Sequence, residues 1–106
     1  MYANNKTVLQ IISLIKQFGI RKVVVSPGVR HAPLVYSLEQ DSDFQLYTVV
    51  DERSAAFFAL GLIQQSGESV AVTCTSGLAC QNYGSAIVEA YYQHLPLLVL
   101  SADRLE

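Results

Sequence analysis

The sequence has little of what membrane-spanning, secreted and nucleic-acid-binding proteins need. No apolar run approaches the ~20 residues of a transmembrane helix. Residues 1–6 lack the basic and then apolar pattern of a secretion signal. The formal net charge is −2, and no basic cluster occurs that would attract nucleic acid. We therefore expect a cytoplasmic protein that has no membrane partner and no nucleic-acid partner.

Cysteine is also scarce, and several familiar site motifs are missing. The two cysteines, Cys74 and Cys80, have neither metal-ligand spacing nor a CxxC arrangement, so we expect two reduced thiols and no metal site on this chain. There is no GxGxxG, GxxxxGK[ST] or GxSxG motif. Dinucleotide binding, P-loop phosphate binding and a serine nucleophile elbow are therefore not indicated.

Lys and Arg are absent from Ser54 through Asp103, and Glu68 is the only charged residue between Ser54 and Val88. The helix expected over 53–65 is apolar almost all round, so it must be buried on more than one side. It is either part of an extensive protein interface or the central helix of a small domain. We favour the interface, because large apolar patches rarely stay exposed in soluble monomers.

Helix and strand patterns alternate along a chain whose 106 residues suit one domain. The expected helices cover 8–18, 31–39, 53–65 and 78–93, and the expected strands cover 23–25, 45–50, 69–75 and 96–101. Continuous apolar strands separated by helices predict a parallel sheet covered on both faces. The expected fold is α/β, doubly wound and flavodoxin-like, with about four strands in the order 2-1-3-4.

Small, hydroxylic or charged residues follow all four expected strands. These are Ser26-Pro27-Gly28, Asp51-Glu52-Arg53, Thr75-Ser76-Gly77 and Ala102-Asp103-Arg104. In a doubly wound sheet, ligands bind at the carboxyl ends of the strands, where the strand order reverses. The first and third loops would then face each other. Turn chemistry alone would also favour Gly, Ser and Pro in such loops, so both explanations stay open.

Asp51 and Glu52 stand between an apolar strand and an apolar helix. A carboxylate placed where water is scarce has a raised pKa, which suits a proton-transfer group. The alternative is a helix N-cap with no chemistry. His31 is expected to lie exposed near a helix start and His94 to lie in a turn, each with a structural role only.

Four segments together resemble the pyrimidine-binding domain of thiamine-diphosphate enzymes. They are VVVSPGVRHAPL at 23–34, DERSAAFFALGL at 51–62, VTCTSGLA at 72–79 and LSADR at 100–104. The resemblance covers nearly the whole chain, and the segments occur in the family's order. Within the family it is nearest to the carboligases of menaquinone biosynthesis.

The resemblance implies a role for each loop. In this family a glutamate after the second strand meets N1′ of the cofactor's aminopyrimidine and prepares removal of the thiazolium C2 proton; Glu52 matches it. Arg30 and Arg104 match arginines that hold substrate carboxylates. The residues that would line the pyrimidine pocket are Ser26, Pro27, Gly28, Thr75, Ser76 and Gly77.

The chain departs from the family at several substrate-side positions. Val29 and His31 replace a serine and a small polar residue, Leu78 replaces a threonine, and Leu105 replaces a proline. Such changes would suit a paralogue with the same cofactor chemistry and a different acceptor.

The implied reaction is decarboxylation of a 2-oxo acid followed by carboligation, namely 2-oxoglutarate adding to isochorismate or a paralogue's variant of that reaction. Mg²⁺ and the cofactor's diphosphate would be held by a second domain, contributed by another subunit of a homo-oligomer. We therefore expect residues 1–106 to be the N-terminal pyrimidine-binding domain of a longer protein, inactive alone, with 105–106 resembling a cloning scar.

Two alternatives remain at this stage. The chain could be a subunit of a split 2-oxo acid decarboxylase, completed by a separate diphosphate-binding partner. It could instead be a non-catalytic, flavodoxin-like interaction module, for which Glu52→Gln would have no effect. The donor and acceptor substrates, and the choice between dimer and tetramer, stay open.

Overall fold

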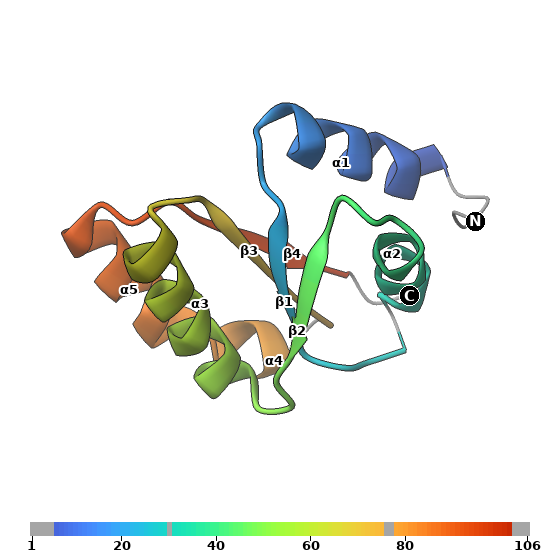
Figure 1. Cartoon of the computed structure of the whole chain (residues 1–106). Helices are drawn as coiled ribbons and strands as arrows, with labels where there is room; N and C mark the ends of the chain where they lie inside the picture. Colours follow the sequence, from blue (N-terminus) through green and yellow to red (C-terminus); the bar gives the residue numbers. More distant parts are fainter. Residues whose placement is uncertain (1–5, 30, 76–77, 103–106) are drawn as a thin grey trace.

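The protein folds around a single parallel sheet. The computed structural model describes residues 6–29, 31–75 and 78–102. Its strands are β1 (Lys22–Val25), β2 (Gln45–Thr48), β3 (Val70–Cys74) and β4 (Leu97–Ser101). They are hydrogen-bonded in parallel in the order β2-β1-β3-β4, so the predicted fold class and strand order are confirmed (Figure 1).

Helices cover both faces of the sheet, as expected of continuous apolar strands. Figure 1 shows α1 (Lys6–Gln17) and α2 (Ala32–Glu39) on one side of the sheet. The other side carries α3 (Glu52–Ser66), α4 (Leu78–Gln81) and α5 (Gly84–Gln93). No helix within the described ranges has the length and apolar character needed to cross a membrane.

The central strand β3 is buried along its whole length and divides the core in two. Val70, Val72 and Cys74 pack with the buried residues of α3 and α5. Ala71 points the other way and packs with α1 and α2. This alternation follows from the two-residue repeat of a strand. It also places Thr73 on the α1/α2 side of the sheet.

Strand β2 is shorter than the predicted 45–50, because its only neighbour, β1, leads into a proline. Val49 N still donates to Val25 O at 3.0 Å. The next ladder bond would need an N–H from Pro27, which has none. Instead, the Ser26 hydroxyl donates to Val49 O at 2.8 Å, and Val50 beyond it is exposed. The strand therefore ends at Thr48.

The predicted helix over 78–93 is interrupted at Asn82 and Tyr83. Tyr83 N bonds back to Cys80 O at 3.1 Å, an i to i−3 bond that tightens the end of α4. The Tyr83 side chain is fully buried in the core beside α3. Asn and Gly are weak helix formers, so a break in the helix between Asn82 and Gly84 costs little free energy.

Helix α3 is one residue longer at each end than the predicted 53–65. Asp51 is its N-cap residue, and Gly67 follows its last turn with a left-handed φ of 72°. Gly67 N donates to Ile63 O at 2.7 Å, which satisfies a carbonyl of the last turn. These two caps fix where α3 begins and therefore where Glu52 is placed.

Candidate cofactor site at the carboxyl edge of the sheet

The loops that follow the parallel strands lie at the same edge of the sheet, as predicted. Ser26 follows β1, Thr75 follows β3, and Ala102 follows β4. Helix α3 starts a few residues after β2. Strands β1 and β3 are neighbours from which the chain leaves to opposite faces, through α2 and α4. This is the switch point where doubly wound sheets bind ligands.

The first and third loops are in direct contact at this switch point. A Cβ added to Gly28 would lie 2.1 Å from Thr75 Cγ2, so the Gly28 backbone rests on the threonine side chain. Ser26 N donates to Thr73 O at 3.0 Å, which fixes the start of the first loop on β3. Among the predicted site residues, Arg30, Ser76, Gly77 and Arg104 lie outside the described residues.

The two adjacent carboxylates have different environments. Asp51 Oδ2 accepts hydrogen bonds from Ser54 N and Ser54 Oγ, each at 2.8 Å. These bonds, with the Arg53 charge nearby, hold the pKa of Asp51 below its usual range. The N-cap explanation therefore applies to Asp51. The side chain of Glu52, the first residue of α3, makes no hydrogen bond or ion pair with any described residue.

Glu52 is only half-buried, so the enclosure expected of its carboxylate is not provided by the described part of this chain. A partner surface would have to supply it. The helix N-terminus at which Glu52 stands favours a negative charge. The structure thus leaves Glu52 available to a ligand rather than bound to a neighbour.

A buried polar group that the sequence did not reveal lies near Glu52. Tyr83 is fully buried, and its hydroxyl has no well-formed hydrogen bond to the rest of the described chain. Burial raises its pKa far above its usual range, and the neighbouring Cys74 and the Glu52 charge add to the rise. Burial likewise raises the pKa of Cys74, a free thiol. The weak helix formers around Tyr83 were the only sequence signal for this position.

The prediction that His31 is exposed is wrong. Its side chain is 3% exposed, and its Nδ1 is hydrogen-bonded to Thr73 Oγ1 at 2.9 Å. The first loop turns under the sheet edge, which brings the ring onto the α1/α2 face beside Thr73. His94 was placed correctly, in the turn after α5, with a left-handed φ of 57°.

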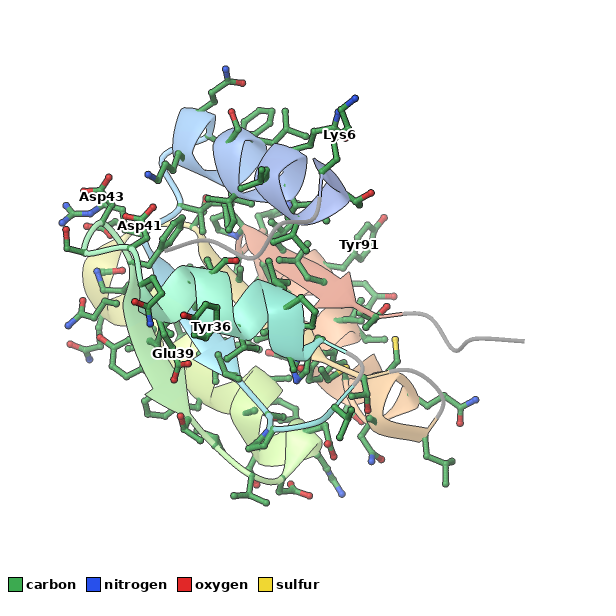
Figure 2. The ribbon with its side chains drawn as sticks, turned by 90° about the vertical axis from the view of Figure 1, so that its right-hand side faces the viewer. Lys6, Tyr36, Glu39, Asp41, Asp43 and Tyr91 are labelled. Atoms are coloured by element: carbon green, nitrogen blue, oxygen red, sulfur yellow. The ribbon has the colours of Figure 1, made fainter. Side chains whose placement is uncertain are left out.

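A cavity of about 360 Å³ adjoins the first loop on the side of α2. Its lining includes Pro27, Gly28, His31, Tyr36 and Glu39. Figure 2 shows Tyr36 and Glu39 extending from α2 on this face. The cavity therefore lies behind the loop, on the opposite side of the sheet from α3 and Glu52.

The described residues include groups that a heterocyclic cofactor could contact. The Glu52 carboxylate can meet a ring nitrogen, and Gly28 and Thr75 pack together at the same edge of the sheet. Exposed Val50 and Leu78 add apolar surface near the same strand ends. No group of three or more His, Cys, Asp or Glu residues that could hold a metal occurs in the part of the chain that the structure describes.

Comparison with known proteins identifies the class. Residues 6–105 match the family described as thiamine pyrophosphate enzyme, N-terminal TPP binding domain, and the chain belongs to this family. The fold agrees with that class: benzoylformate decarboxylase from Polynucleobacter necessarius superposes with a TM-score of 0.81, at 23% identity, over 100% of this chain and 19% of the other.

The most similar relatives share one name. The chain is 51% identical over 104 residues to 2-succinyl-5-enolpyruvyl-6-hydroxy-3-cyclohexene-1-carboxylate synthase of Phocaeicola vulgatus. It is 52% identical over the same length to the synthase of that name from Bacteroides fragilis. Both matches cover 98% of this chain and 19% of the relative. The resemblance found in the sequence is confirmed, and the non-catalytic interaction module is not favoured.

Proposed function

We propose that this chain is the aminopyrimidine-binding domain of a longer thiamine-diphosphate-dependent carboligase of the 2-succinyl-5-enolpyruvyl-6-hydroxy-3-cyclohexene-1-carboxylate synthase type. The observation that carries the proposal is the 51% identity to such a synthase over 98% of the chain. The fold supports it, since a half-buried, unpaired Glu52 begins α3 at the ligand-binding edge of the sheet. A paralogue with a different acceptor is the finer variant of the same proposal.

In this proposal, Glu52 holds and moves a proton at N1′ of the aminopyrimidine. When bound, the cofactor supplies a carbanion-stabilising centre for decarboxylation and carboligation. Asp51 fixes the start of α3 and so directs Glu52 towards the site. Closure of a partner surface over the half-buried Glu52 would exclude water from its carboxylate and so favour proton transfer.

The remaining loops would bind and orient the cofactor and the substrates. Ser26, Pro27 and Gly28 would form one wall of the aminopyrimidine pocket, and Thr75, Ser76 and Gly77 the other. Arg30 and Arg104 would hold carboxylates of the substrates, proposed as 2-oxoglutarate and isochorismate, through bidentate hydrogen bonds. Their guanidinium groups keep their charge at any relevant pH, which suits an anionic substrate.

The rest of the site would come from elsewhere in the protein. A diphosphate-binding domain would hold Mg²⁺ and the cofactor's diphosphate, and it would belong to another subunit of a cytoplasmic homo-oligomer. The chain spans 19% of the length of these curated relatives, which leaves room for such a domain. A split enzyme with the two domains on separate chains would bring the same residues together.

The proposal is tested by exchange of the C2 proton of thiamine diphosphate, followed by NMR in deuterated buffer with the full-length protein. We expect fast exchange that falls by about 10²- to 10⁴-fold in Glu52→Gln, the usual contribution of a positioned acid–base group. Glu68→Gln is the matched control, because Glu68 lies at the opposite edge of the sheet, bonded to Lys22. Exchange that is equally slow in all three proteins would refute the proposal.

A further inference from the structure

The side chain of His31 is placed in an unusual way for a helix N-cap residue. It begins α2 but makes no side-chain bond to that helix. Its ring is buried and bonds through Nδ1 to Thr73 of β3, while Nε2 has no hydrogen-bond partner among the described residues. A buried, half-satisfied imidazole is unfavourable. The position therefore needs an explanation other than helix capping.

Thr73 holds both ends of the loop that runs from Ser26 to His31. Its backbone carbonyl accepts from Ser26 N at 3.0 Å, and its hydroxyl bonds to His31 Nδ1 at 2.9 Å. Between these anchors, Gly28 rests against Thr75, two residues further along the same chain segment. Thr73 near the end of β3 and Thr75 just beyond it thus fix the start, the middle and the end of this loop.

His31 also borders two cavities. His31 lines both the cavity of about 360 Å³ beside α2 and another of about 470 Å³ bounded by α1 and the end of β4. A smaller side chain, such as the small polar residue expected here from the family resemblance, would leave space on both sides.

We propose that His31 is a positioning residue, which with Thr73 holds the loop of Ser26, Pro27 and Gly28 in its cofactor-binding position. The inference deepens the proposed function and rests on it. The imidazole touches neither Glu52 nor α3, which lie across the sheet. Its effect is therefore on cofactor affinity and not on proton transfer at Glu52.

The test uses the full-length protein with Mg²⁺ and three kinds of variant. His31→Phe keeps a ring of similar shape and removes the bond, and Thr73→Val keeps the volume of the strand residue and removes the hydroxyl. Thr73→Ser keeps the hydroxyl and should therefore retain the hydrogen bond to His31. His94→Phe is the matched control, since His94 is exposed in the turn after α5.

We expect His31→Phe and Thr73→Val each to raise the dissociation constant for thiamine diphosphate by about three- to tenfold, the usual effect of one lost hydrogen bond. The rate constant at saturating cofactor and the C2-proton exchange of the saturated protein should be unchanged. The double variant should be no weaker than either single variant, because the two residues act as one pair. Thr73→Ser and His94→Phe should bind as the unaltered protein does.

Other results overturn the proposal in distinguishable ways. Unchanged cofactor affinity in His31→Phe and Thr73→Val, or additive effects in the double variant, would reduce His31 to a packing residue. A slower C2-proton exchange in the cofactor-saturated variants would show that His31 acts on Glu52 instead. Solution-like exchange in the unaltered protein would refute the proposed function itself, and this inference with it.

Discussion

At the scale of single residues, the contact between Gly28 and Thr75 is the tightest constraint on the candidate site. Gly28→Ala should destabilise the chain by about 1–3 kcal/mol, because its Cβ would overlap Thr75 Cγ2. Urea unfolding followed by circular dichroism measures this change. Adding Thr75→Ser removes the overlapping methyl group and should recover most of the loss.

The control for that substitution is a glycine with open space around it. Gly61 lies inside α3, and a Cβ there would meet nothing within 4 Å. Gly61→Ala should therefore stabilise the chain by up to about 1 kcal/mol through helix propensity. If Gly28→Ala does not lower the free energy of unfolding relative to Gly61→Ala, the two loops are not packed as the structure has them.

His31 should also make stability depend on pH. Burial lowers its pKa from the usual 6.5, partly opposed by the Ser26 backbone. The unfolded chain then binds a proton at a higher pH than the folded chain does. The free energy of unfolding should therefore fall as the pH drops below about 6.5, down to the lowered pKa.

Urea unfolding between about pH 7 and pH 5 measures this effect, in a range above the usual titration of carboxylates. His31→Phe should make the profile flatter, and His94→Phe should leave it as it is. An identical pH profile in all three chains would show that His31 is not a buried neutral histidine.

At the scale of elements, α3 shows how one N-terminus serves both structure and the proposed chemistry. Asp51→Ala should destabilise the chain by about 1 kcal/mol through loss of the N-cap, whereas Asp51→Asn should retain most of the stability. Chemical unfolding of the two variants compares them directly. Equal stability of Asp51→Ala and the unaltered chain would mean that the cap does not fix where α3 begins.

At the scale of the whole molecule, α3 and α5 carry a large exposed apolar surface. Their exposed large apolar residues are Phe57, Phe58, Ile87, Val88, Tyr91 and Tyr92. The buried side of α3 packs on the sheet through Ala55, Ala56 and Ala59, which leaves both of its phenylalanines partly exposed, although Phe58 also packs against Tyr47. This arrangement supports the interface explanation over that of a fully enclosed central helix.

The proposed oligomer can be tested on that surface. Val88→Glu should dissociate the oligomer of the full-length protein into subunits, because it would place a charge in an apolar contact between them. Sedimentation velocity measures the assembly state. Phe18→Glu is the control, since Phe18 is 77% exposed beyond the end of α1, on the other side of the sheet. An oligomer unaffected by Val88→Glu would place the interface elsewhere.

The sequence alone was sufficient for the fold class and the strand order, and it predicted the edge of the sheet at which the candidate site lies. These follow from local patterns: apolar strands alternating with helices, polar residues after each strand, and a capping aspartate before α3. Because such signals lie within a few residues of one another, they can be read without knowing what packs against them. The thiamine-diphosphate family was recognisable for the same reason.

Only the tertiary structure decided which neighbours these residues have. The end of β2 depends on Pro27 in the loop after the adjacent strand, and the break before α5 depends on a core that buries Tyr83. The burial of His31 depends on a hydroxyl 42 positions away along the chain. These outcomes arise from contacts between distant segments, whose energies no local pattern encodes. For that reason the sequence predicted the residues of the candidate site, and the packing decided how their loops are held.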